Sequence, residues 1–132
     1  MMKRKSIYVD GFGHGSNPTP AACTGGGLLI SGALFGMNPQ TQKLAEGQQA
    51  QCDLMFSVAQ RVLEAGGTTW DGVLKMNFFI TPDFPREMIN SHWLRLFSDP
   101  KSRPARHVVT TNNLPPGMHL QCDITALTGD EA

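Results

Sequence analysis

The sequence predicts an α+β domain in which two helices cover one face of a mixed sheet. Apolar and polar residues alternate strictly over residues 118–127, which is the period of a half-buried strand. A single apolar stripe at helical spacing runs along Gln48–Ala65. A second helical pattern begins near Asp83, directly after a clear strand at Val73–Ile80. The expected order of elements is β-β-α-β-α-β-β.

The first half of the chain alternates short strands with loops. Residues 7–9 are a strand candidate, and residues 11–20 are so rich in glycine and proline that they predict a long loop. A buried strand bracketed by glycines is expected at residues 28–35, followed by a turn at residues 38–41. A pair of glycines ends the first helix.

The second half should contain the second helix and two further strands. Asp83 is the expected N-cap of this helix, Pro85 lies early in its first turn, and Trp93 points inward. Two prolines punctuate the loop that follows, before a strand at residues 105–111. Residues 114–117 then form a turn into the last strand.

The second face of this sheet has a mixed composition. Strand alternation places Leu74 on the core side and puts Val73, Phe79 and Val108 on the second face. Gln121 and Asp123 of the last strand share that face. Such a face is too apolar for free exposure and too polar for a dry core. A buried interface between subunits, lined with a few functional groups, would explain it; an ordinary half-solvated sheet is the alternative.

Composition limits the class of protein. The 132 residues fit one domain, spanning 1–132, with 40% apolar and 17% charged residues. The formal net charge of zero disfavours a dedicated nucleic-acid binder. No apolar run reaches the roughly 18 residues of a membrane span, and no signal peptide is evident. Three widely spaced cysteines, an odd number, argue against a disulfide framework and favour a reducing cytoplasm.

Several kinds of site are disfavoured. Cys122 and Cys52 fall on apolar faces and are expected in the core, so only Cys23 is a candidate for an accessible thiol. No pair of ligands at metal spacing occurs, so no metal is expected. The glycine run at residues 25–27 precedes a strand and not a helix, which leaves no helix N-terminus for a phosphate.

Arg106 is the candidate with a physical rationale. A charge within a strand bordered by Ala105 and Val108 is costly without a partner. The planar guanidinium suits a carboxylate ligand, which it can bind with two parallel hydrogen bonds. An arginine that extends to solvent or pairs with Asp123 is the alternative.

Three blocks of sequence resemble the RidA/YjgF family, also called endoribonuclease L-PSP. They are Leu29-Ile30-Ser31-Gly32 with Asn38-Pro39-Gln40-Thr41, the helix end Val62-Leu63-Glu64-Ala65-Gly66-Gly67, and Ser102-Arg103-Pro104-Ala105-Arg106 followed by Leu114-Pro115. The similarity runs from about residue 18 to residue 127. It implies a chorismate-mutase-like fold of the Bacillus type and a homotrimer with a ligand cleft at each subunit boundary.

The resemblance also implies a reaction. Family members with this arginine hydrolyse enamines and imines, such as 2-aminoacrylate and 2-iminobutanoate, to 2-oxo acids and ammonia, without a metal or organic cofactor. By this resemblance Arg106 holds the substrate carboxylate together with the backbone N–H of Val108. Ser31 and Gly32 line the other side of the cleft, and Thr19 stands where the family often has an aromatic residue.

Two departures from the family pattern concern the same cleft. The acid that orients or activates water in the well-studied deaminases is replaced by Gln121, which can bind a water but cannot take its proton. Asp123, on the same face, is a possible substitute. The loop at residues 11–20 carries an additional histidine, His14, which points to a different or longer substrate.

Four functions therefore stay open. The first is deamination of a small imino or enamino acid. The second is a trimer that binds 2-oxo or imino acids without turnover. The third is RNA cleavage, which the neutral charge disfavours. The fourth is hydrolysis of a larger, ring-opened enamine.

Overall fold

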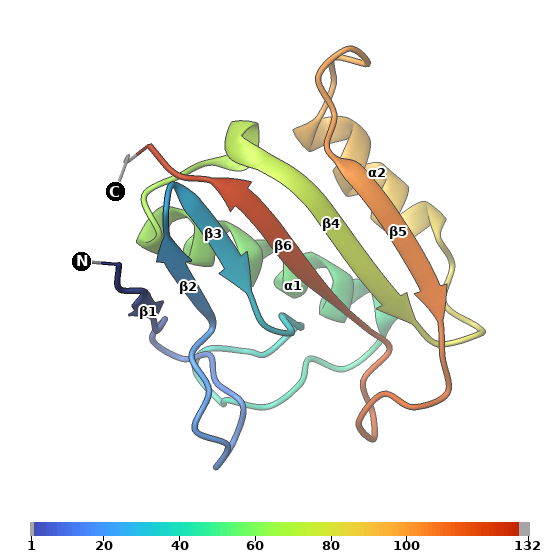
Figure 1. Cartoon of the computed structure of the whole chain (residues 1–132). Helices are drawn as coiled ribbons and strands as arrows, with labels where there is room; N and C mark the ends of the chain where they lie inside the picture. The colour runs from blue at the N-terminus through green and yellow to red at the C-terminus, as the bar shows by residue number, and fades with distance from the viewer. Residues whose placement is uncertain (1, 130–132) are drawn as a thin grey trace.

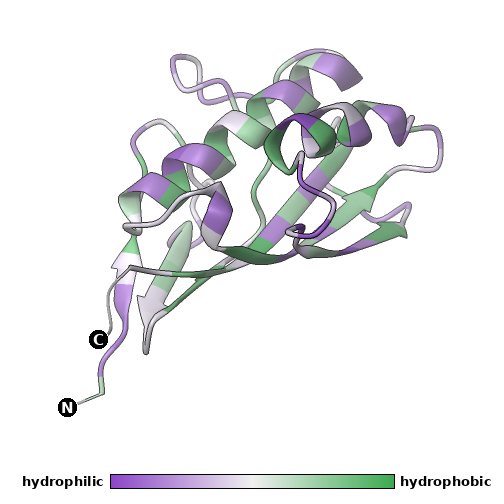
Figure 2. Cartoon of the chain, turned by 90° about the horizontal axis from the view of Figure 1, so that it is seen from above, coloured by the Kyte–Doolittle hydropathy of each residue, from purple (hydrophilic) through white to green (hydrophobic). Residues whose placement is uncertain are grey.

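The computed structural model describes residues 2–129 as one mixed sheet with both helices on the same side (Figure 1). Seen from above, the helices form a single layer over the sheet and leave its other face uncovered (Figure 2). The elements are β1 (Lys5–Ile7), β2 (Ala22–Gly25), β3 (Leu28–Ser31), α1 (Gln48–Ala65), η1 (Trp70–Gly72), β4 (Val73–Ile80), α2 (Glu87–Leu96), β5 (Ala105–Thr110) and β6 (Leu120–Leu127). This architecture confirms the predicted fold class.

The strands lie in the order β1-β2-β3-β6-β4-β5. Only β4 and β5 pair in parallel, because α2 carries the chain back between them; all other pairs are antiparallel. The described part of the sheet therefore ends in a free edge at β5. Neither helix within residues 2–129 is long and apolar enough to cross a membrane.

The structure contains one strand that the sequence pattern did not predict. β2 pairs with β3 through a hairpin turn at Gly26 and Gly27, whose φ angles are 60° and 81°. Two consecutive residues at positive φ match a type I′ turn, which explains the glycine run at residues 25–27. Four residues are too few to show a strand period, so β2 becomes visible only through its partner. The predicted strand at 28–35 ends at Ser31.

A β-bulge reverses one predicted orientation at the start of β4. The register shifts between Val73 and Lys75, so that two residues of β4 oppose one of β6. Val73 is 6% exposed and packs in the core, whereas Leu74 is 45% exposed on the opposite face. The prediction that placed Val73 outside and Leu74 inside was therefore wrong. Strict alternation fails wherever a strand carries an extra residue.

The predicted position of Val108 was also wrong. Val108 pairs with Phe78, which is fully buried beneath the helices, so Val108 lies on the helix side of the sheet. Phe79, Gln121 and Asp123 do lie on the uncovered face, as predicted. We call this surface the open face; its most exposed large apolar side chains are Leu28, Ile30, Leu74 and Leu127.

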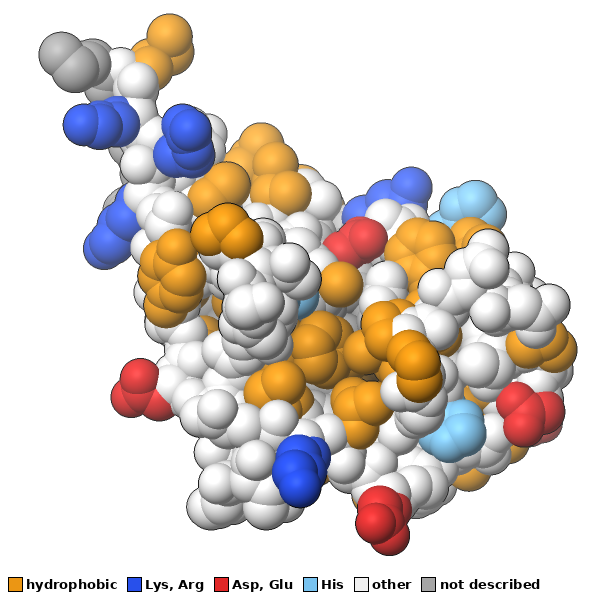
Figure 3. All heavy atoms as spheres, turned by 90° about the horizontal axis from the view of Figure 1, so that it is seen from below, with side chains coloured by type: hydrophobic (Ala, Val, Ile, Leu, Met, Phe, Trp, Pro, Cys, Tyr) orange, Lys and Arg blue, Asp and Glu red, His pale blue; other side chains and the backbone are white. Residues whose placement is uncertain are grey.

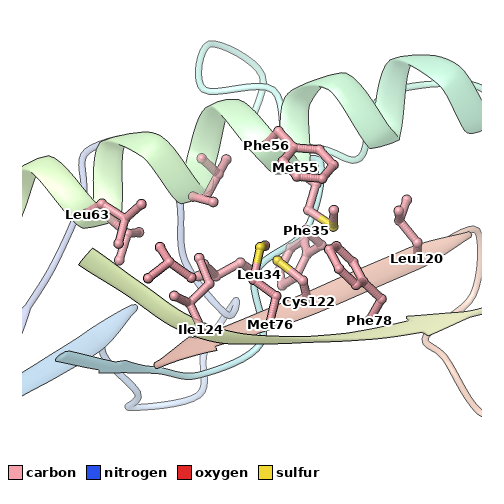
Figure 4. Close-up of a cluster of buried hydrophobic side chains, with 14 of the residues drawn as sticks. Leu34, Phe35, Met55, Phe56, Leu63, Met76, Phe78, Leu120, Cys122 and Ile124 are labelled. Carbon is pink, nitrogen blue, oxygen red and sulfur yellow. The ribbon is translucent and has the colours of Figure 1, made fainter. Parts of the chain in front are cut away.

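The hydrophobic core fills the space between the helices and the sheet (Figure 4). Met55 and Leu63 of α1 and Met76 and Phe78 of β4 all lie in this space, and all four are almost fully buried. Burial of such side chains stabilises the fold by roughly 1.5–3 kcal/mol each. Cys52 and Cys122 lie in this core, as predicted.

Polar contacts fix the two helices. His92 of α2 lies 2.7 Å from the Asp53 carboxylate of α1, and its ring stacks on Phe56. Asp83 does not cap α2: its carboxylate accepts a hydrogen bond from the Thr81 hydroxyl instead, at 2.8 Å. The helix begins at Glu87, so Asp83 lies too far upstream for its side chain to reach the first turn.

Candidate functional site

Arg106 lies on the helix side of the edge strand β5. It pairs with Met76 of β4, and Met76 pairs with Ile124 of β6. The Ile124 N–H donates to the Ser31 hydroxyl at 2.9 Å, so one line across the sheet joins Arg106 to Ser31. On this line, β6 and β4 lie between the residue of β3 and the residue of β5. Three strand spacings amount to about 14 Å.

The side chain of Arg106 is held by two residues of α2 that the sequence analysis did not assign to a site. Its guanidinium donates to the Asn90 side-chain oxygen at 2.7 Å and lies 5.0 Å from the centroid of the Trp93 ring. The Phe78 ring lies 5.8 Å from the guanidinium on the sheet side. Aromatic faces stabilise a cation and restrict its orientation. The only sequence signal was the inward position predicted for Trp93, one turn after Asn90.

Electrostatics at Arg106 favour an anionic ligand. Burial lowers the pKa of the guanidinium, and the positive charge of Arg86 lowers it further. The group nevertheless stays charged in a protein. Within residues 2–129 no carboxylate oxygen lies within 4.0 Å of it, and Asp123 pairs elsewhere. Pairing with Asp123 is therefore absent from this arrangement, whereas the guanidinium remains partly exposed to solvent while Asn90 and Trp93 hold it.

The backbone of Val108 points its N–H to the free edge of the sheet. The Thr111 N–H donates to the Ile80 carbonyl of β4 at 2.9 Å. Because successive N–H groups of a strand point in opposite directions, those of Val108 and Thr110 face away from β4. Arg106 and Val108 are two residues apart in β5, so the guanidinium and this N–H lie at the same free edge of the sheet. We call Asn90, Trp93, Arg106 and Val108 the arginine group.

A second group of predicted residues gathers near the end of β3. The Ser31 hydroxyl donates to the Gly32 carbonyl at 2.8 Å, and the Gly32 N–H donates to the Ala21 carbonyl at 2.9 Å. Thr19 is exposed in the loop just before β2. Hydrophobic side chains gather at the centre of this end of the molecule (Figure 3). We call His14, Thr19, Ser31 and Gly32 the loop group.

His14 anchors the 11–20 loop to the segment after β3. Its Nε2 lies 2.8 Å from the Ala33 carbonyl, which makes Nε2 the protonated nitrogen. The ring packs edge-on against Phe12 and Phe35. Its Nδ1 is buried and has no hydrogen-bond partner among the described residues. The contacts of His14 thus shape the loop group.

Gln121 and Asp123 lie on the open face, the opposite side of the sheet from the Arg106 side chain. Gln121 of β6 pairs directly with Phe79 of β4. The Asp123 carboxylate accepts a hydrogen bond from the Asn77 amide at 2.7 Å. One chain therefore brings neither residue into contact with the arginine group, and it holds the arginine and loop groups at separate places.

Other features of the surface do not complete a site in one chain. Hollows of about 260 Å³ and 410 Å³ lie between α1 and α2 and beside the entry to β5, and other residues line them. Among residues 2–129, no three His, Cys, Asp or Glu side chains gather as a metal site requires. Burial raises the pKa of the Cys52 thiol to about 12 and that of Cys122 above its usual range.

The fold and these groups define a class: a small α+β domain whose candidate ligand-binding side chains lie at a sheet edge and at a distant loop. Comparison with known proteins identifies the family. The sequence profile described as Endoribonuclease L-PSP matches residues 17–128. This chain belongs to that family, the RidA/YjgF family that its sequence blocks resemble.

Individual relatives agree with this assignment. A RutC family protein of Aquifex aeolicus is 31% identical over 102 residues, which cover 77% of this chain and 81% of that protein. YyfA of Yersinia pestis, from the conserved Rid protein family, superposes with a TM-score of 0.84 at 25% identity, covering 96% and 100% of the two chains. Escherichia coli TdcF, solved with bound serine, shares the fold: its TM-score is 0.82 at 21% identity, covering 95% and 99% of the two chains.

Proposed function

We propose that this protein is an enamine/imine deaminase that converts small 2-imino or 2-enamino acids to 2-oxo acids and ammonia. The position of Arg106 carries the proposal. Asn90 occupies one of its five N–H donors, Trp93 restricts its plane, and no carboxylate of the described residues neutralises it. The remaining donors suit a substrate carboxylate, with the Val108 N–H as a neighbouring donor.

The site is completed at a subunit boundary in a homotrimer. Two observations support this assembly. The arginine group and the loop group lie about 14 Å apart within one chain, too far to contact one small substrate. The open face also leaves apolar side chains such as Ile30 and Leu74 exposed beside polar Gln121 and Asp123, a mixture that fits a covered interface.

The chemistry needs orientation more than a strong base. An enamine first takes a proton on carbon and becomes the iminium. The oxygen of water then attacks the imine carbon, which is already electrophilic, and forms a carbinolamine. A proton passes from oxygen to nitrogen, the C–N bond breaks, and ammonia leaves as the C=O bond forms. Arg106 fixes the carboxylate so that the imine carbon faces the positioned water.

Gln121 and Asp123 have different roles in this scheme. Gln121 can hold the attacking water by hydrogen bonds but cannot accept its proton. Asp123 lies two residues further along the same face, and the Asn77 amide occupies only one of its carboxylate oxygens. It is therefore the candidate acceptor for the proton, with solvent as the alternative.

Turnover of 2-aminoacrylate tests the proposal. The compound is generated in the assay by a pyridoxal-phosphate dehydratase acting on serine, and pyruvate formation above the spontaneous rate is measured. Arg106→Ala should lower the excess rate by two orders of magnitude or more, because it removes the group that orients the substrate. Lys101→Ala, a change of the same charge on an exposed loop, is the matched control. Equal rates for wild type and Arg106→Ala would refute the proposal.

Gln121 favours a second candidate, a trimer that binds 2-oxo acids without turnover. This protein would then gain thermal stability from 2-oxobutanoate while consuming no imine. Gln121→Glu separates the two candidates further. If the protein is a deaminase, this substitution should raise the rate of imine hydrolysis, because it supplies a base. If the protein only binds its ligand, the other groups cannot support turnover and the rate of imine hydrolysis stays at zero.

A further inference from the structure

Arg86 lies beside the arginine group in a position that the proposed reaction does not use. It is the residue before the first turn of α2, and its backbone carbonyl accepts the Asn90 N–H at 3.0 Å. Residues four apart lie on the same side of a helix, so Arg86 and Asn90 are neighbours. Since Asn90 in turn accepts from Arg106, two arginines flank one amide.

Neither arginine has a carboxylate partner within the described part of the chain. Within residues 2–129, one ion pair has its nitrogen and oxygen within 4.0 Å of each other. It joins His92 to Asp53, between α1 and α2. The two acids nearest in sequence do not neutralise Arg86: Asp83 accepts from the Thr81 hydroxyl, and Glu87 forms no ion pair. Burial lowers the pKa of Arg106, and the positive charge of Arg86 lowers it further, as expected for two neighbouring cations.

Two like charges held together favour a ligand that supplies two negative charges. A simple 2-imino acid has one carboxylate, which Arg106 binds, and it leaves Arg86 unpaired. A ligand with a second carboxylate at the end of its side chain would neutralise both. Arg86 is exposed, and among residues 2–129 its side chain forms no hydrogen bond or ion pair, so it can reach such a group from the rim of the site.

We propose that Arg86 is a specificity-determining residue that binds the side-chain carboxylate of a dicarboxylic 2-imino acid. This inference rests on the proposed function, because it uses Arg106 as the anchor of the first carboxylate. The reaction is unchanged: 2-iminoglutarate and water give 2-oxoglutarate and ammonia. The second carboxylate takes no part in bond making and serves only for recognition.

Binding of two 2-oxo acids of equal chain length tests the charge preference without turnover. 2-Oxoglutarate and 2-oxopentanoate differ only by a carboxylate in place of a methyl group. Wild type should bind 2-oxoglutarate about ten-fold more tightly, the effect of one charge-assisted hydrogen bond at a partly exposed site. Arg86→Gln should abolish this ratio and Arg86→Lys should retain part of it. Lys101→Gln, the same charge change on a distant loop, should keep it.

Turnover of the matching imines separates this inference from the proposed function. An amino-acid oxidase generates 2-iminoglutarate or 2-iminopentanoate, and the ratio of the two kcat/KM values is compared between wild type and Arg86→Gln. A ratio that falls about ten-fold in the variant supports both proposals. Hydrolysis of both imines with an unaltered ratio overturns the role of Arg86 and leaves the deaminase intact. An Arg86-dependent binding ratio without any turnover supports the dicarboxylate site and overturns the deaminase.

Discussion

Replacement of Gln51 by leucine should destabilise the protein by about 3 kcal/mol. Gln51 lies on α1 and is 2% exposed. Its amide nitrogen donates to the Ala45 carbonyl at 2.9 Å and the Gly117 carbonyl at 2.8 Å, and its oxygen accepts the His119 N–H at 2.8 Å. One side chain thus joins the loop before α1 to the turn before β6. Leucine matches its size but leaves three backbone groups without partners.

The magnitude follows from those three groups. An unpaired buried group costs about 1–3 kcal/mol, and the lower value applies because Gly117 and Ala45 can reach water after a small adjustment. For a chain of 132 residues, a loss of about 3 kcal/mol lowers Tm by roughly 10 °C. Urea and thermal unfolding at one fixed protein concentration measure the effect, because assembly makes Tm depend on concentration.

Gln49→Leu is the matched control. Gln49 is exposed on the same helix and makes one surface hydrogen bond, to Asp53. Loss of this hydrogen bond in Gln49→Leu should change the free energy of unfolding by no more than about 0.5 kcal/mol. If the two variants differ by less than 1 kcal/mol, Gln51 does not join these segments in the way described.

Three further results are expected. Asn90→Ala should raise KM about ten-fold with a smaller effect on kcat, because the guanidinium it holds becomes mobile; an unchanged KM would contradict this role. Ile30→Glu should convert the proposed trimer to monomers in sedimentation experiments, whereas Leu94→Glu, similarly exposed on α2, should not; identical behaviour would count against the open face as the interface. Cys52 should resist alkylation at pH 8 in the native protein and react in denaturant, since its thiol titrates near 12; labelling of the folded chain would argue against its burial.

The sign of the pH effect follows from the same thiol. Burial raises the pKa of Cys52 from 9.0 to about 12 in the folded protein. Above pH 9 the unfolded chain therefore loses a proton that the folded chain keeps, and stability falls as the pH rises through this range. Below pH 9 both states hold the proton and the contribution is constant.

The long elements could be predicted from the sequence because their periods are local. α1 and β4 begin and end where the apolar pattern placed them, since a stripe over the 18 residues of α1 or an alternation over most of the eight residues of β4 leaves little ambiguity about their bounds. The residues that mark the family could also be recognised, because a chemical motif such as the one around Arg106 depends on residue types along the chain.

Tertiary structure decided what depends on partners. β2 exists because the turn at Gly26 and Gly27 folds it onto β3, and the bulge beside Val73 exists because β6 accepts two residues against one. Each of these changes which side chains face the helices. The glycine pair marks the turn, but no local pattern shows the bulge, because its extra residue is defined only against the neighbouring strand.

The candidate site illustrates the same division. The sequence singled out Arg106 as a candidate for binding a carboxylate and Gln121 as a departure from the family pattern. Only the folded chain placed Asn90 and Trp93 around the guanidinium, put Arg86 next to it, and showed that Gln121 lies on the other face. These relations join residues of α2, β5 and β6 that are distant in sequence, so they follow from the packing of a helix on a sheet edge and not from any spacing along the chain.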